Sequence, residues 1–104
     1  YGEGEIQAIY AHNDQMALAA AETLAAAGRD KEGILICGMD GEEAAFKMVE
    51  DGSMAFTIIY PTMAPEGIIA AHNILTGEEQ EAEVVCESTL VDADNVADYI
   101  GKGL

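Results

Sequence analysis

The sequence predicts an α/β fold in which a parallel sheet carries helices on both faces, giving three layers. Short apolar runs alternate with alanine-rich or amphipathic runs, and short glycine-containing loops separate them. Repeated strand–helix units of this kind are typical of parallel sheets whose crossovers are helices. The apolar run at 33–38 is continuous rather than alternating, which indicates a strand covered on both faces.

The first strand–helix unit carries an unusual junction. Residues Ile6–Ala11 predict a strand, and the polar triplet His12-Asn13-Asp14 follows it. Residues Asp14–Ala27 predict a helix of strong propensity that ends before Gly28. We expect Asp14 to be the N-cap of this helix, because its carboxylate can accept hydrogen bonds from the first backbone N–H groups.

The remaining elements follow in the same alternation until two prolines interrupt it. Pro65 is well placed to begin a helix, and glycines mark the helix ends. We expect Asp92 or Asp94 to cap the last, short helix. The predicted elements are a strand at Gly33–Gly38, a helix at Gly41–Glu50, a strand at Met54–Tyr60, a helix at Pro65–Thr76, a charged loop at Glu78–Glu83, a strand at Ala82–Glu87 and a helix around Val96–Ile100.

The amino-acid composition argues against some classes of binding partner. The chain has 20 Asp and Glu against 4 Lys and Arg, for a formal net charge of -16. Such a surface repels nucleic acids and anionic membranes, and no apolar run is long enough to span a bilayer. Cys37 lies within an apolar strand, so we expect a buried free thiol rather than a bridge to Cys86.

Polar or aromatic residues follow each of the first three predicted strands. Ligands of open parallel sheets bind beyond the carboxyl ends of the strands, so these clusters are expected to share one edge. Three clusters on one edge suggest a ligand site. They are Asn13-Asp14, Met39-Asp40-Gly41 and Tyr60-Pro61-Thr62.

These side chains suit a polyhydroxylated ligand. Asn13 offers a donor and an acceptor, Asp40 offers a strong acceptor, and Tyr60 offers an aromatic face for the C–H side of a sugar ring. Each residue also has an alternative structural role: Asn13 can share the capping of the first helix, Asp40 can cap the helix after Gly41, and Tyr60 can cover the sheet end. His12 is expected to be a surface neighbour of the site.

Catalytic and metal-binding patterns are absent from the sequence. It contains no Gly-x-Ser-x-Gly, no His-Glu-x-x-His and no phosphate-binding Gly-Lys-Ser/Thr loop. An acid–base pair of Asp40 and His12 would lack a nucleophile. We therefore expect a binding protein rather than an enzyme, with no cofactor and no metal.

Four blocks of the sequence resemble the carboxyl-terminal portion of the periplasmic sugar-binding proteins of the ribose and galactose type. The resemblance covers nearly the whole chain and keeps the order and spacing of the blocks. They are AIYAHNDQMALAAAETLAAAGR, ILICGMDGEEAAFKMVEDGSMAFTIIYPT, EGIIAAHNILTGEE and LVDADNVADYI.

The resemblance implies a Rossmann-like lobe of a two-lobe fold, with a sugar clamped between the lobes. It implies that Asn13 and Asp40 hydrogen-bond sugar hydroxyls. Tyr60 stands where many members have a hinge glutamine, and Met39 stands where relatives often carry an aromatic residue beside the sugar. The substrate is therefore a monosaccharide or polyol whose identity the resemblance leaves open, as it does the choice between transport and sensing.

The resemblance also implies that the chain is a fragment of an ABC transporter's substrate-binding component, which delivers its ligand to a permease from the periplasm or, in Gram-positive cells, as a surface lipoprotein. Residues 1–60 would belong to the carboxyl-terminal lobe. Residues 61–81 would cross the hinge and place a helix on the missing amino-terminal lobe, and residues 82–104 would return. Uncovered apolar faces predict self-association, for example by exchange of the Pro65–Gly77 helix between copies.

Two other classes of protein share this fold and are alternative interpretations of the sequence. The effector lobe of a LacI-type repressor has similar blocks, but such relatives usually show Pro-x-Leu-Thr-Thr where this chain has AFTIIYPTMAPEG. The sensor domain of a membrane histidine kinase uses the same two-lobe clamp. An enzyme of another class lacks support because no nucleophile or metal cluster is present.

Overall fold

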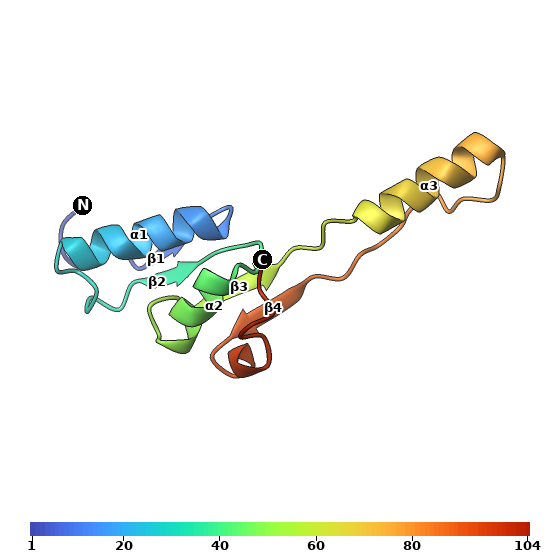
Figure 1. Cartoon of the computed structure of the whole chain (residues 1–104). Coiled ribbons are helices and arrows are strands. Elements are labelled where there is room, and N and C mark those ends of the chain that lie inside the picture. The colour runs from blue at the N-terminus through green and yellow to red at the C-terminus, as the bar shows by residue number, and fades with distance from the viewer.

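The computed structural model describes residues 1–104 and shows a small α/β lobe from which one helix projects (Figure 1). Three strands alternate with three helices before a fourth strand and a short 3-10 helix close the chain. The elements are β1 at Ala8–Tyr10, α1 at Asp14–Ala26, β2 at Leu35–Cys37, α2 at Glu43–Glu50, β3 at Phe56–Ile59, α3 at Ala64–Thr76, β4 at Thr89–Asp92 and η1 at Val96–Asp98.

The four strands form one sheet in the order β1-β2-β3-β4. The first three run parallel, with Ile9 opposite Ile36 and Cys37 opposite Phe56. Strand β4 is antiparallel to β3, with Thr57 opposite Val91. The prediction of a parallel sheet is therefore correct for β1 to β3, and the sheet is mixed because the chain returns from α3 in the opposite direction.

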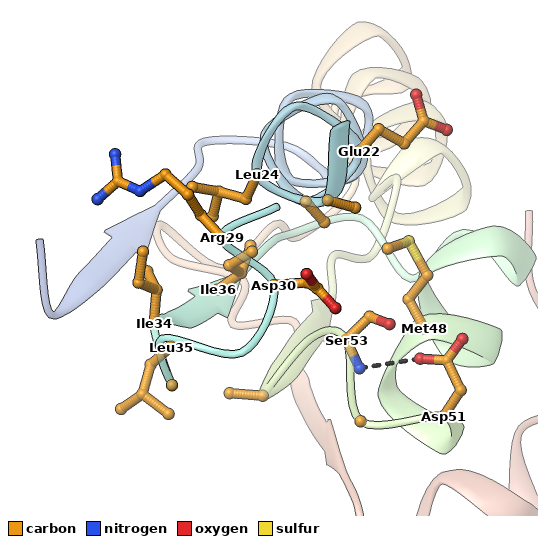
Figure 2. Close-up of a pocket in the computed structure, with 15 residues that line it drawn as sticks. Glu22, Leu24, Arg29, Asp30, Ile34, Leu35, Ile36, Met48, Asp51 and Ser53 are labelled. Carbon is orange, nitrogen blue, oxygen red and sulfur yellow. Dashed lines mark hydrogen bonds between the residues drawn. The ribbon is translucent and has the colours of Figure 1, made fainter. Parts of the chain in front are cut away.

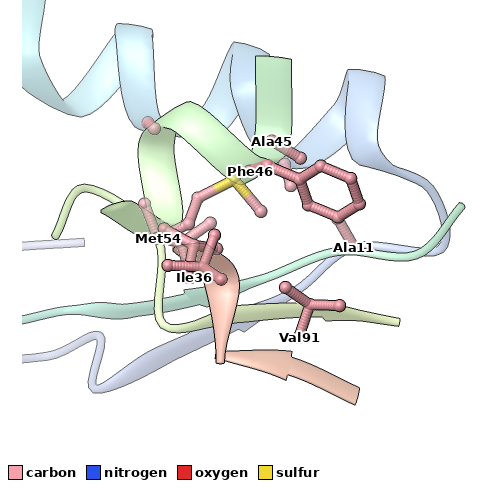
Figure 3. Packing of buried hydrophobic residues seen from close by; sticks show 10 residues of the cluster. Ala11, Ile36, Ala45, Phe46, Met54 and Val91 are labelled. Atoms are coloured by element: carbon pink, nitrogen blue, oxygen red, sulfur yellow. The ribbon is translucent and has the colours of Figure 1, made fainter. Parts of the chain in front are cut away.

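The core lies between one face of this sheet and the helices α1 and α2 (Figure 3). Phe46 of α2 is 1% exposed and its ring lies 6.0 Å from that of Tyr99. Ala17 and Ala21 let α1 approach the sheet closely, since an alanine adds only one methyl group to the interface. The buried cluster comprises Ala11, Ala17, Ala21, Ile36, Ala45, Phe46, Val49, Met54, Val91 and Val96.

The other face of the sheet is open in this chain. Side chains alternate along a strand, so the register places Tyr10, Leu35 and Leu90 on the face opposite the core. These side chains are 56%, 60% and 48% exposed. The chain therefore supplies two of the three predicted layers, and an apolar sheet face lacks a cover.

The helix α3 projects from the lobe as an arm (Figure 1). None of its residues is buried, and the molecule measures 59 × 29 × 19 Å. Its radius of gyration is 17.8 Å, whereas a compact domain of this size has about 13 Å. In the returning segment Gln80 accepts a hydrogen bond from Asn73, at 3.0 Å, which closes the tip of the arm.

The predicted fourth strand at Ala82–Glu87 is wrong, because this segment forms no strand and β4 lies at Thr89–Asp92. Val84 and Val85 are 49% and 78% exposed along the arm, where no neighbouring strand is within reach. The backbone pairs with β3 only at residues that lie beside it again, beyond the returning segment of the arm. Leu90 and Val91 are the central residues of the strand that forms there.

The carboxyl-terminal turn also differs from the prediction. The last helix is the 3-10 helix Val96–Asp98, and its N-cap is Asn95 rather than Asp92 or Asp94. Asn95 Oδ1 accepts a hydrogen bond from the backbone N–H of Asp92 at 3.0 Å, and Asp92 accepts one from Asp94. These side chains stabilise a tight turn after β4 and cap no helix.

The cysteines are free, as predicted. Cys37 is buried in β2, where its thiol donates to the carbonyl of Ile9 at 3.4 Å. Burial raises the pKa of the Cys37 thiol, because the thiolate would lose hydration. The thiol therefore behaves as a small apolar group of the sheet.

Candidate functional site

The carboxyl ends of β1, β2 and β3 bring the predicted site residues to one edge of the sheet. The backbone N–H of Asp40 donates to Ile58 O at 2.8 Å, and Asp40 forms a parallel bridge with Ile59. The N–H of Tyr60 in turn lies 3.5 Å from Asp40 O. The ends of β2 and β3 are therefore joined directly, which places Asp40 beside the start of the segment that carries Tyr60.

Asn13 caps α1, and this corrects the expected role of Asp14. The N-cap residue is Asn13, whose Oδ1 accepts a hydrogen bond from the N–H of Met16 at 2.8 Å. This bond fixes which side of the amide faces the helix. The Nδ2 group makes no hydrogen bond within the chain, so Asn13 presents a donor at the sheet edge.

Asp14 is the first residue of α1 and is completely buried. Its Oδ2 accepts hydrogen bonds from the N–H groups of Gly41, at 2.9 Å, and Glu42, at 2.8 Å. Its Oδ1 accepts one from the hydroxyl of Thr57 at 2.6 Å. The carboxylate thus connects the start of α1 with the loop after β2 and with the middle of β3.

The sequence offered two signals for this network. Asn13 and Asp14 stand in tandem, and only one of them is needed as a cap. Thr57 is a polar residue within the otherwise apolar run of β3. Neither signal identifies the partners, because Asp14 and Thr57 are 43 residues apart.

Asp40 does not cap α2. The N-cap of α2 is Glu42, which makes no side-chain capping bond. The carboxylate of Asp40 makes no hydrogen bond within the chain, while its backbone has a φ of 125°, a conformation that residues with a side chain rarely adopt. Asp40 therefore presents an unpaired acceptor on a strained backbone.

Two glycines beside Asp40 make room for this arrangement. A Cβ on Gly38 would lie 2.2 Å from Asp14 Oδ1. A Cβ on Gly41 would lie 2.8 Å from Cγ1 of Ile59, and Gly41 also has a φ of 83°. Glycine is therefore required at positions 38 and 41 by close packing around the buried carboxylate and the end of β3.

The remaining predicted residues lie at the same edge with fewer contacts. Tyr60 is 48% exposed and Met39 is half-buried. His12 is exposed, and its ring lies 5.4 Å from that of Tyr10 in an edge-to-face arrangement. The other histidine, His72, lies exposed on α3, away from this edge.

The arrangement at the edge suits binding of neutral polar groups. Asn13 offers an N–H donor and Asp40 a carboxylate acceptor, which together match hydroxyl groups that accept and donate. No group of three or more His, Cys, Asp or Glu side chains is placed to hold a metal ion. None of the helices is long and apolar enough to cross a bilayer.

A separate groove lies at the opposite edge, by the amino ends of β2 and β3 (Figure 2). It has a volume of about 490 Å³ and lies between the ends of α1 and α2. Leu24, Ile36 and Met48 form part of its apolar lining, and Asp30 and Asp51 stand at its rim. None of the predicted site residues lines this groove.

Residues 1–79 match the periplasmic binding protein domain family, so the chain belongs to this family. The ribose import binding protein RbsB of Haemophilus influenzae is 40% identical over 87 residues. The alignment covers 79% of this chain and 28% of that relative. The chain thus spans 28% of the length of this curated relative.

Solved structures of such proteins share the fold. The fructose-binding periplasmic domain of a hybrid two component system superposes with a TM-score of 0.80 and 32% identity, over 93% of this chain and 33% of that chain. An ABC transporter solute binding protein from Mycobacterium smegmatis, with bound glycerol, gives 0.84 and 28%, over 95% and 35%. The predicted α/β fold and the predicted family are both confirmed.

Proposed function

We propose that the chain is part of the substrate-binding component of an ABC transporter, which captures a monosaccharide or polyol between two lobes and delivers it to a membrane permease. The placement of Asn13 and Asp40 at one sheet edge, in a chain of this family, carries the proposal. A protein with this role binds its ligand without transforming it and works in the periplasm or at the outer cell surface.

The chemistry of the edge supports a ligand rich in hydroxyl groups. Asn13 donates through Nδ2, Asp40 accepts, and Tyr60 offers an aromatic face beside them. The matched proteins bind such compounds by name: RbsB is a ribose import protein, and solved relatives hold D-allose, glycerol or myo-inositol. Met39 stands next to Asp40 and would contribute flexible apolar contact to the same ligand.

The proposed division into two lobes accounts for the open position of the site at the edge of the sheet in this chain. A cleft between two lobes has one wall in each, so a single lobe presents its wall as an open edge. Residues 1–60 and the return segment would form the carboxyl-terminal lobe, and 61–81 would cross the hinge to the other lobe. The contact of Leu104 N with Gly41 O, at 3.2 Å, supports placing the chain end on the first of these lobes.

The ligand is identified by a thermal-shift screen of the complete binding protein. The panel is D-ribose, D-fructose, D-allose, myo-inositol and glycerol. The site assignment is then tested by calorimetry with the ligand that gives the largest shift. Asn13→Asp keeps the oxygen that caps α1 but removes the Nδ2 donor, and Asp40→Asn removes the charged acceptor.

Each substitution is expected to weaken binding by at least about tenfold, because Asn13→Asp leaves a ligand hydroxyl without its donor and Asp40→Asn replaces a charge-assisted hydrogen bond with a weaker neutral one. Asp30→Asn is the matched control, since Asp30 is an exposed carboxylate far from this edge. It should bind as the unsubstituted protein does. Unchanged affinity in both site variants would contradict the assignment.

The isolated chain would associate with a second copy by exchanging α3. The helix exposes apolar side chains, Ile74 by 69% and Leu75 by 86%, and the open sheet face exposes Tyr10 and Leu35. Light scattering of the 104-residue chain should therefore show a dimer, and Leu75→Glu should shift it toward monomer. A stable monomer at high concentration would contradict this part of the proposal.

A sensing role is the second candidate. The fructose-binding domain of the hybrid two component system matches 93% of this chain with 32% identity, so the same lobe serves a signalling protein. The two roles predict the same ligand contacts. Uptake of labelled ligand by cells, with and without the gene, separates them, because a sensor domain would leave direct transport unchanged.

A further inference from the structure

We infer that Asp14 is a positioning residue for the proposed ligand site: its buried carboxylate holds the loop that presents Asp40 in register with the helix end that presents Asn13. The inference rests on the proposed function, because it concerns the same sheet edge. It adds a residue that no ligand touches and that nevertheless determines how tightly a ligand is held.

The three donors to Asp14 come from two other segments of the chain. Gly41 and Glu42 belong to the loop between β2 and α2, and Thr57 belongs to β3. Each segment also leads to a residue of the site. Asn13 directly precedes Asp14, Asp40 directly precedes Gly41, and β3 leads into Tyr60. The carboxylate is therefore the common anchor of all three parts of the edge.

Asp40 needs such an anchor because its backbone is strained. Its φ of 125° lies outside the ordinary regions for a residue with a side chain. The strained residue is held on both sides: its own N–H donates to Ile58 O at 2.8 Å, and the N–H of Gly41 donates to Asp14 at 2.9 Å. If the second bond is lost, the Asp40 backbone can relax and its carboxylate changes direction.

The space around Asp14 is shaped for a carboxylate. The closest approach is at Gly38, where a Cβ would lie 2.2 Å from Oδ1, so a side chain at that position would force the carboxylate to shift. The two oxygens take up three donors, and no buried side-chain polar atom lacks a partner. An asparagine fits the same pocket, since its oxygen can accept from both amides and its Nδ2 can donate to Thr57.

A purely structural role for Asp14 makes a different prediction. If the network only stabilises the lobe, substitutions should lower the melting temperature without altering the affinity of the folded protein. A positioning role predicts that affinity falls further than in an equally destabilised variant whose site edge is intact. Val49→Ala supplies that comparison, because Val49 is 2% exposed near the end of α2 and lies away from the carboxyl edge.

The experiment uses the complete binding protein, with D-ribose as the first probe and the best ligand of the panel if D-ribose is not bound. Calorimetry is performed well below the melting temperature of every variant. Asp14→Ala is expected to weaken binding by roughly 100-fold through displacement of Asp40, and Thr57→Val by roughly fivefold to tenfold. Asp14→Asn should recover most of the affinity that Asp14→Ala loses.

Hydrogen exchange of the ligand-free protein gives a second measurement if Asp14→Ala folds poorly. Thr57→Val and Asp14→Asn should fold, and the amides of Gly41 and Glu42 report directly on the anchor. These amides should exchange faster in Thr57→Val than in Val49→Ala, when each is compared with the amides of α2 in the same variant. Equal protection in the two variants would contradict the anchor itself.

The outcomes separate this inference from the proposed function. Reduced binding in Asn13→Asp and Asp40→Asn with unchanged binding in Asp14→Ala and Thr57→Val would overturn the positioning role and leave the function intact. Affinity losses in the Asp14 and Thr57 variants no larger than in Val49→Ala would also overturn it. Unchanged binding in all of these variants would overturn the proposed site together with the inference.

Discussion

The helices α1 and α3 have the same length, 13 residues, and opposite environments. Helix α1 buries Asp14, Ala17 and Ala21 against the sheet, whereas α3 buries no residue. Yet α3 carries larger apolar side chains, including Ile68, which is 71% exposed. Apolar content alone therefore does not place a helix in a core; a matching surface within the same chain is also needed.

The comparison divides the chain into a lobe and an arm. All of the buried residues lie in the lobe, and the segment 61–88 contains none. The lobe should thus behave as a cooperative unit, whereas the arm buries none of its residues within the chain. The same type of substitution, made once in the lobe and once in the arm, should therefore change stability by different amounts.

The largest contrast is expected between Phe46→Ala in the lobe and Ile74→Ala in the arm. Phe46 is 1% exposed, so truncation leaves a cavity and should lower the free energy of unfolding by about 3–5 kcal/mol. Ile74 is 69% exposed, so its truncation should change stability by less than about 0.5 kcal/mol. Urea unfolding in the Leu75→Glu background, which is expected to be monomeric, measures both, and a large effect at Ile74 would show that the arm packs within its own chain.

A second pair uses glycines. Gly38→Ala should destabilise the lobe by about 1–3 kcal/mol, because the new Cβ would lie 2.2 Å from Asp14 Oδ1 and 3.1 Å from Cβ of Ala17. Gly67→Ala in α3 meets nothing within 4 Å and should favour the helix by about 1 kcal/mol.

Thermal unfolding followed by circular dichroism checks this pair. The Gly38 variant should melt at a lower temperature, while the Gly67 variant should gain helical signal with little change in the main transition. A Gly38→Ala protein as stable as the unsubstituted chain would mean that the carboxylate of Asp14 can move away from its three donors.

Much of this architecture follows from local sequence. The last helix is shorter than predicted and is a 3-10 helix, but α1, α2, α3, their glycine boundaries and the shared edge of the three polar clusters were predicted correctly, because periodicity and turn residues act over a few positions. The position of β4 was not, since it depends on how far the chain travels along the arm before it can reach β3 again. The apolar pair Val84-Val85 carries strand propensity and has no partner strand.

The hydrogen-bond partners at the site could not be predicted from neighbouring residues in the sequence. Asn13 rather than Asp14 caps α1, because either side chain satisfies the capping pattern and only the tertiary donors Gly41, Glu42 and Thr57, which engage Asp14, decide between them. The continuous apolar run of β2 predicted a strand covered on both faces. This prediction is wrong for the described chain, because one face of the sheet is open and Leu35 is 60% exposed.

The smallest expected effect concerns the ion pair between Arg29 and Glu32, at which Arg29 also holds the backbone of Tyr1 and Gly2. Arg29 donates to both carboxylate oxygens of Glu32, at 2.6 and 2.9 Å, and also to the carbonyls of Tyr1 and Gly2. The hydrogen bond from Arg29 lowers the pKa of Glu32, against the opposing effect of desolvation, and the hydrogen bond to Glu32 raises the pKa of Arg29.

The direction of these shifts fixes the pH dependence. Because the pKa of Glu32 is lower in the folded chain than its ordinary value of 4.5, its contribution is complete above that pH and is lost as the pH falls through the lowered value. The raised pKa of Arg29 matters only in strong alkali. Since many other carboxylates titrate in the same acidic range, the melting temperature of the unsubstituted chain must be compared with that of Glu32→Gln at each pH. The difference should be small, as for other ion pairs near the surface, and should vanish on acidification. A difference that persists in acid would mean that Glu32 stabilises the chain through something other than its charge.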